Sequence, residues 1–351
     1  MKIEEWKKGT YNAINWNNIE DEIDKQTWEK LTSQFWLDTR IPVSNDLDDW
    51  RTISQSERRV VDLAFGGLTL LDTLQSQDAL NILRRSHRTP QEIAVYNNIE
   101  FMESVHAKSY STIFITLNNT ARIDEIFNWT DTYEQLQYKA NHINAIYQNG
   151  SDLQAKAANV MLETFLFYSG FYAPLWYLGN NKLENVAEII KLIIRDESVH
   201  GTYIGYKFQK GYLELPDNER DRLKNWVFET IYELYENEEK YARYIYDEIG
   251  WTDEVLTYSR YNANKALQNL GFDPLFPDTA EDVNPIVMNG ISTGTSNHDF
   301  FSQVGNGYLL GNVEAMADED YSKWAMSNRR EQRMAYRKRK KAEQEKRNNE
   351  K

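Results

Sequence analysis

Apolar residues recur at steps of three and four positions along most of this chain of 351 residues. This period is typical of helices that bury one face. Between Gln91 and Leu270 the pattern contains only two prolines, Pro174 and Pro216, and proline is rare inside helices. Helices are therefore predicted over residues 57–85, 91–117, 131–147, 153–177, 183–210, 218–248 and 254–270.

Long helices make up almost all of the predicted structure, because segments with the two-residue alternation of strands are nearly absent. One helix start is marked by Thr89 as a cap, Pro90 at the first helical position and Glu92 three residues after the cap. Helices of about 25 to 30 residues are ~40 Å long, well above the usual mean. The predicted fold class is all-α, a long-helix bundle.

The composition changes at Asp273, where prolines and then glycines replace the helical pattern. We expect a helical domain with an N-terminal arm over residues 1–272, a flexible tail over 273–324 and a basic extension over 325–351. Residues 329–351 hold eleven Lys and Arg against four Glu, a local charge of +7 in a chain of net charge −14. The remaining −21 argues against nucleic-acid binding, and the simplest interpretation of the basic end is a solvated tail.

The composition also narrows the possible chemistry. The chain has no cysteine, which excludes disulfides, zinc–thiolate and iron–sulfur sites and a catalytic thiol. Its start, MKIEEWKKGT, has neither an apolar run nor a cleavage site, so we expect no secretory signal and a cytoplasmic location. The longest apolar stretches are shorter than the ~18 residues of a membrane span. Any metal must therefore be bound by oxygen and imidazole.

One four-residue frame occurs twice, as Glu103-Ser-Val-His106 and as Glu197-Ser-Val-His200. A glutamate and a histidine three residues apart on a helix lie on one face and can bind one metal ion. A single frame of this kind is weak support in a chain with 54 acids, and a lone histidine is more often a core residue. Two frames in apolar helices together predict a metal site.

An acid precedes each frame by about the length of a helical hairpin. Asp72 lies 31 residues before the first frame's glutamate, and Glu163 lies 34 residues before the second. Asp62 and Asp78 are alternatives to Asp72, whose neighbours are the most apolar. Four buried carboxylates are balanced by two divalent cations, whereas each would cost several kcal/mol if left unpaired. The predicted centre is dinuclear, with iron or manganese as the favoured metals and zinc as an alternative.

Tyr110 follows His106 by four residues, which places its ring one helical turn further along the metal-facing side. Phe167, Phe171 and Ile193 share the metal-facing stripes of their helices. A phenol beside a redox metal in an apolar pocket can lose an electron and a proton and persist as a radical. A packed core tyrosine is the alternative interpretation.

At these positions the sequence resembles the small, radical-generating subunit of class I ribonucleotide reductase, most closely its Ib subgroup. The resemblance extends over about residues 15 to 324. It rests on the segments Gly67–Gln75, Phe101–Tyr110, Leu162–Phe171, Arg195–Gly201, Asn297–Ser302 and Gly305–Tyr308. One departure is the end of the chain, because such subunits stop soon after an acidic, aromatic docking tail, which here resembles Asp318–Trp324.

This resemblance implies a ferritin-like fold, a homodimer and a large partner subunit that reduces ribonucleotides to deoxyribonucleotides with its own cysteines. It implies two metal ions per chain, with the ligands Asp72, Glu103, His106, Glu163, Glu197 and His200. It also implies a radical on Tyr110 in an apolar pocket formed by Phe167, Phe171 and Ile193. The stations that it implies for radical transfer are Trp36, Asp196 and Tyr308.

In the Ib subgroup the metals are manganese, assembled with a reduced flavodoxin-like activator, or iron, assembled with oxygen. From the residues alone, Trp36 is one of ten tryptophans, and Asp196 has the local role of orienting a ligand histidine. Two other functions use the same scaffold. A dimetal oxidase or desaturase needs the ligands but neither Tyr110 nor a docking tail, and an iron-storage protein forms a cage that holds hundreds of ions.

Overall fold

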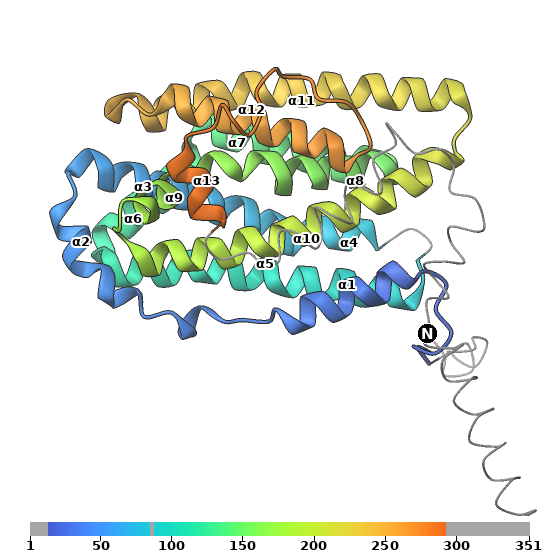
Figure 1. The fold of residues 1–351 in the computed structure, drawn as a ribbon, viewed down its shortest axis with the longest axis horizontal. Coiled ribbons are helices and arrows are strands. Elements are labelled where there is room, and N and C mark those ends of the chain that lie inside the picture. Colours follow the sequence, from blue (N-terminus) through green and yellow to red (C-terminus); the bar gives the residue numbers. More distant parts are fainter. Residues whose placement is uncertain (1–12, 85–87, 293–351) are drawn as a thin grey trace, which may run out of the picture. The chain divides into compact units, whose positions relative to one another are not determined.

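The computed structural model describes residues 13–84 and 88–292, and all regular structure within them is helical (Figure 1). The all-α class predicted from the sequence is confirmed for this part of the chain. The longer helices are α1 (Glu22–Ser33), α3 (Gln55–Leu74), α5 (Pro90–Leu117), α6 (Thr120–Thr132), α7 (Glu134–Asn149), α8 (Asp152–Met161), α9 (Tyr168–Gly179), α10 (Glu184–Glu214), α11 (Asp217–Tyr246) and α12 (Thr252–Asn269). The short ones are α2 (Leu47–Thr52), α4 (Leu80–Leu83) and α13 (Pro285–Ser292).

The helix ends follow local chemistry. The side chain of Thr89 accepts a hydrogen bond from the Glu92 amide, and Pro90 opens α5, as predicted. Ser54 and Glu57 form a capping box, so α3 begins two residues before the predicted start. The prediction missed α1 and α6, because most residues of both helices are polar and few are buried.

The segment after Asp273 is less irregular than predicted, because it contains α13. This helix packs against α9, and Val287 is fully buried there. Gly179, at the end of α9, permits the close approach, since a side chain at this position would collide with Ile286. The rest of the predicted tail, residues 293–324, and the basic extension 325–351 lie outside the described residues.

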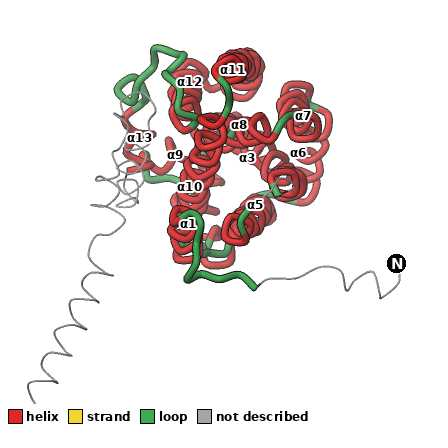
Figure 2. Tube along the Cα trace, turned by 90° about the vertical axis from the view of Figure 1, so that its right-hand side faces the viewer, coloured by secondary structure: helices red, strands yellow, loops and turns green. Residues whose placement is uncertain are grey.

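Helices α3, α5, α8 and α10 run beside one another and form the centre of the bundle (Figures 1 and 2). Helices α7, α11 and α12 cover one side of this centre, and α1 lies along α5 and α10 on the other. Within the described residues, no helix is both long enough and apolar enough to cross a membrane. The central helices are those in which the sequence predicts metal ligands.

Two π-helical turns interrupt the central helices. One spans Gln75–Ala79 between α3 and α4, and the other spans Leu162–Leu166 between α8 and α9. The sequence predicts uninterrupted helices at both places. Single π-helical turns occur frequently at functional sites. The first of these two turns begins three residues after the predicted ligand Asp72, and the second contains the predicted ligand Glu163.

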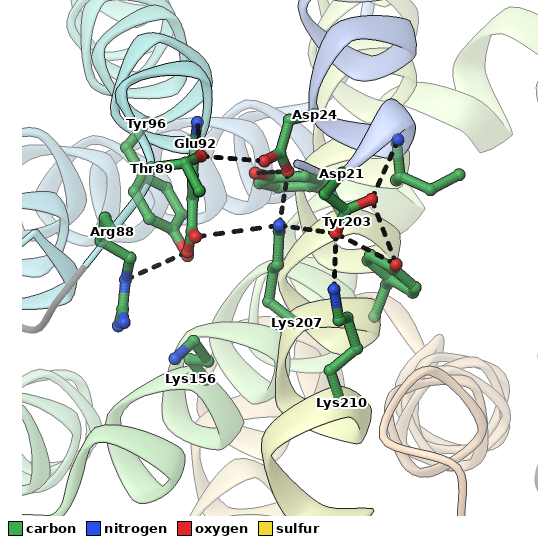
Figure 3. Close-up of polar contacts among 12 residues, drawn as sticks. Asp21, Asp24, Arg88, Thr89, Glu92, Tyr96, Lys156, Tyr203, Lys207 and Lys210 are labelled. Carbon is green, nitrogen blue, oxygen red and sulfur yellow. Dashed lines mark hydrogen bonds and ion pairs between the residues drawn. The ribbon is translucent and has the colours of Figure 1, made fainter. Parts of the chain in front are cut away.

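A cluster of charged side chains holds α1 on the bundle (Figure 3). The ammonium nitrogen of Lys207, on α10, lies 3.0 Å from Asp21 Oδ2 and 2.5 Å from Asp24 Oδ1. The Tyr203 hydroxyl donates a hydrogen bond of 2.8 Å to Asp24, and Glu92 of α5 lies 3.8 Å from the same ammonium. The cluster therefore joins α1 to both α5 and α10.

Replacing Lys207 by Met should lower the free energy of unfolding by about 3 to 5 kcal/mol, because two buried carboxylates lose their shared cation. Burial acts to raise the pKa of Asp21, but the ammonium groups of Lys207 and Lys210 outweigh it and hold that pKa below 3.8. This stabilisation is present above the ordinary pKa and is lost as the pH falls through the lowered one. Urea unfolding should be measured between pH 7 and pH 3. The difference in unfolding free energy between the variant and the unsubstituted protein should become smaller below about pH 3.8.

Lys210→Met is the matched control. Lys210 contacts the same carboxylate at 2.9 Å, but half of its side chain is exposed. Its loss should cost less than about 1 kcal/mol. If both variants lost the same unfolding free energy, the burial of Lys207 would not be the reason that the cluster stabilises the fold.

Candidate dinuclear metal centre

All six predicted metal ligands come together in the middle of the bundle. Helix α3 contributes Asp72, α5 contributes the first Glu-x-x-His frame and α10 the second, and Glu163 lies in the π-helical turn between α8 and α9. The side chains of all six are fully buried. Asp62, the alternative to Asp72, instead accepts a hydrogen bond of 2.9 Å from Arg122.

The ligand atoms form two overlapping groups of four, and within each group they lie within 4.8 Å of one another. The first group consists of Asp72, Glu103, His106 and Glu197. The second group consists of Glu103, Glu163, Glu197 and His200. Because both groups contain the two frame glutamates, Glu103 and Glu197 would contribute to both metal positions.

Each histidine lies closest to the glutamate of the opposite frame. The Nδ1 atom of His106 is 2.9 Å from Glu197 Oε1 and 3.6 Å from Glu103 Oε2. Similarly, Nδ1 of His200 is 2.9 Å from Glu103 Oε1 and 3.5 Å from Glu197 Oε2. The two imidazole rings stack at 6.1 Å between centroids. The packing of α5 on α10 therefore brings the two frames into one site.

The polar atoms of this site fit metal ions better than they fit one another. In the described part of the chain, well-formed hydrogen bonds are lacking for both oxygens of Asp72, Glu103 and Glu197, for Oε2 of Glu163, and for Nδ1 of both ligand histidines, whose 2.9 Å contacts are with the glutamates of this same site. Buried polar atoms without partners are costly, and two divalent cations would satisfy them and neutralise four carboxylates. An all-oxygen-and-nitrogen donor set suits manganese or iron.

Burial and mutual repulsion govern the protonation of the site. Burial, with the charge of Glu103, raises the pKa of Asp72 well above its usual range, and burial likewise raises that of Glu163. Burial also acts to raise the pKa of Glu103, but the two imidazoles outweigh it and bring that pKa to about 2. Without cations, protons therefore occupy part of this site, and metal binding releases them.

Two of the predicted radical-transfer residues form a chain that ends at the centre. The indole nitrogen of Trp36 donates a hydrogen bond of 2.7 Å to Asp196, which lies 3.3 Å from Nε2 of His106. The Trp36 ring also stacks on that imidazole at 5.9 Å. The third predicted station, Tyr308, lies outside the described residues.

The residues that hold Asp196 in place were not predicted from the sequence. Gln34 donates a hydrogen bond of 3.4 Å to Asp196, and Arg195 donates one of 2.6 Å to the Gln34 carbonyl oxygen. Both residues are neighbours in sequence of the predicted stations. Their positions next to Trp36 and Asp196 were the only sequence features that could have identified them.

Tyr110 is fully buried on α5, as expected for a residue one turn beyond His106. Burial and the negative charge of Asp72 raise the pKa of its phenol well above the usual range, so the hydroxyl keeps its proton. The ring of Phe65, on α3, lies 5.6 Å away. Phe65 was not predicted from the sequence, although its position seven residues before Asp72 places it on the same helix face.

Phe167, Phe171 and Ile193 are fully buried in the same hydrophobic core. The Phe167 and Phe171 rings contact each other edge-on at 6.1 Å between centroids. Their role as a pocket for a radical stays a prediction.

Comparisons with known proteins agree with this geometry. The family described as ribonucleotide reductase, small chain, matches residues 13–285. The ribonucleoside-diphosphate reductase subunit beta of Mycobacterium leprae is 49% identical over 88% of this chain and 95% of that protein. The ribonucleoside-diphosphate reductase 2 subunit beta of Escherichia coli is 45% identical over 90% of this chain and 99% of that protein.

A crystal structure of dimanganese(II)-NrdF from Streptococcus sanguinis is similar in both sequence and fold. It shares 68% identity with this chain and has a TM-score of 0.80, and the match covers 80% of this chain and 100% of that one. The expected ferritin-like bundle with a buried carboxylate and histidine site is confirmed.

Proposed function

The chain belongs to the ribonucleotide reductase small-chain family, and from this premise we propose that Tyr110 carries the radical that starts ribonucleotide reduction. As a small (beta) subunit of ribonucleoside-diphosphate reductase similar to class Ib, it pairs with a large subunit and forms a dimer. Reduction of a ribonucleotide needs thiols, and this chain has no cysteine. The reaction that produces deoxyribonucleotides therefore takes place in the partner.

One observation carries this proposal: two overlapping ligand groups share two carboxylates beside a buried tyrosine. When bound, the two metal ions supply the oxidising power. Tyr110 then gives up one electron and its hydroxyl proton, and the adjacent Asp72 carboxylate is the proposed acceptor of that proton. The apolar surroundings exclude water and reductants from the resulting radical, with Phe167, Phe171 and Ile193 as proposed members of that pocket.

Trp36, Asp196 and Tyr308 are the proposed route by which an electron leaves the large subunit and reaches Tyr110. The hydrogen bond between the Trp36 indole and Asp196 supports this assignment, since oxidation of the indole can pass its proton to that carboxylate. Gln34 and Arg195 hold Asp196 in the required place. The proposed tail for docking on the partner lies within residues 273–324, after α13, because α13 itself packs on α9.

Manganese is the first proposed metal, with two ions per chain, because the similar Streptococcus sanguinis protein is a dimanganese(II) protein. Its assembly would use a reduced flavodoxin-like activator, and assembly with iron and oxygen is the alternative. The proposed location is the cytoplasm. The other two functions considered, a dimetal oxidase or desaturase and an iron store, lack the support of the matched relatives.

The experiment is reconstitution of the metal-free protein with manganese and activator, or with iron and oxygen, followed by mixing with the large subunit. We expect about two ions per chain by metal analysis, a tyrosyl signal in electron paramagnetic resonance, and deoxyribonucleotide formation only when both subunits are present. Oxidase activity without the large subunit would favour the oxidase function instead. Hundreds of ions in a cage would indicate storage.

A further inference from the structure

The two ligands that precede the Glu-x-x-His frames have different surroundings. Oε1 of Glu163 accepts a hydrogen bond of 2.5 Å from the side-chain nitrogen of Gln75, whereas its Oε2 has no such partner in the described part of the chain. Neither oxygen of Asp72 accepts a hydrogen bond from a described residue. One oxygen of Glu163 is therefore held by a hydrogen bond, while neither oxygen of Asp72 is held in this way.

A third side chain fixes the orientation of the Gln75 amide. The hydroxyl of Tyr147, on α7, donates a hydrogen bond of 2.6 Å to Gln75 Oε1. Burial and the charge of Glu163 raise the pKa of Tyr147 well above its usual range, so this phenol keeps its proton and remains a donor. A flipped amide would turn its oxygen toward the carboxylate. The orientation with the amide nitrogen toward Glu163 is therefore the one that satisfies all three groups.

The position of this chain of three residues in the fold argues for a specific purpose. Glu163 and Gln75 are fully buried, and each lies in one of the two π-helical turns. An amide in an apolar core is costly unless both of its ends are bonded, and here both are bonded in a line that ends on a metal ligand. Both bonds are made between side chains and neither belongs to the backbone ladder of a helix.

We propose that Gln75 is a positioning residue that restricts Glu163 to binding through Oε2 and so makes the metal position of Glu163 and His200 unequal to that of Asp72 and His106. The inference rests on the proposed function, because it presumes that both positions bind metal. A carboxylate that binds through one oxygen leaves a coordination position for a small ligand such as water or azide. The open coordination position would therefore be at the ion held by Glu163 and His200.

The test compares the dimanganese form of the protein with its Gln75→Met variant, which keeps the side-chain length but donates no hydrogen bond. We expect crystal structures to show Glu163 bound through Oε2 alone in the unsubstituted protein and through both oxygens in the variant. Azide binding to the cobalt(II)-loaded protein, followed by visible absorption, should weaken by about 10- to 100-fold in the variant, as for other losses of a residue that orients a ligand.

Tyr147→Phe provides a second variant with little change in core volume. It leaves Gln75 in place but removes the donor that fixes its amide, so azide binding should weaken by less than in Gln75→Met. Gln77→Met changes an exposed glutamine on the same π-helical turn and should bind azide normally.

Single-oxygen binding by Glu163 in Gln75→Met would overturn the inference, and so would unchanged azide affinity with only a lower melting temperature. Neither result would contradict the proposed function, provided that the unsubstituted protein binds two ions per chain and gives a tyrosyl signal. An unsubstituted protein that binds fewer than two ions per chain would overturn both the proposed function and this inference.

Discussion

Tyr110→Phe should abolish the tyrosyl signal and ribonucleotide reduction, while two metal ions per chain remain bound. Phenylalanine keeps the ring that packs beside Phe65 and removes only a hydroxyl that has no well-formed hydrogen bond to any described residue. The substitution should therefore change stability little, since no buried partner is left unpaired. Electron paramagnetic resonance measures the tyrosyl signal, and metal analysis measures the ions per chain. An assay with the large subunit measures ribonucleotide reduction.

Tyr258→Phe is the matched control for that substitution. Tyr258 is also fully buried, and its hydroxyl likewise lacks a well-formed hydrogen bond among the described residues. Its loss should leave both the signal and the turnover intact. A tyrosyl signal that persists in Tyr110→Phe would place the radical on another of the 22 tyrosines.

His200→Ala should reduce the metal content to at most one ion per chain and remove all activity. The imidazole is the only nitrogen donor of its ligand group, and its replacement leaves a cavity among carboxylates. His106→Ala should have the same effect on the other group and should also break the link to Asp196. Metal analysis after loading and desalting provides the measurement.

His142→Ala is the control for both histidine variants. His142 lies outside the two ligand groups and packs against Tyr138 at 5.5 Å, so its loss should leave two ions per chain. Two ions retained in His106→Ala or His200→Ala would contradict the assignment of these residues as ligands. His87 and His298 lie outside the described residues.

The sequence predicted which six side chains come together in the bundle, because their spacing carries the geometry. Residues three apart on a helix share a face, and two identical frames in apolar helices can hardly both be surface features. What the sequence could not predict is that each histidine lies nearest to the glutamate of the opposite frame. That arrangement depends on how α5 and α10 pack, and no local pattern encodes it.

Other features were missed for identifiable reasons. Gln75 and Tyr147 are 72 residues apart, and an amide and a phenol have no characteristic spacing. Helix α13 is short and lies in a segment rich in proline, so tertiary packing on Gly179 decides its structure rather than composition. Helix α1 places only Leu31 fully in the core and is held in addition by charges, so a search for hydrophobic period overlooks it.

The sharing of two glutamates by both ligand groups has a thermodynamic consequence. An ion in one position arranges Glu103 and Glu197 for the other, and it also alters the charge that the second ion meets. Occupancy of the two positions is therefore linked, and the linkage is reciprocal. An affinity measured for one ion is a property of the pair and depends on whether the neighbouring position is already filled.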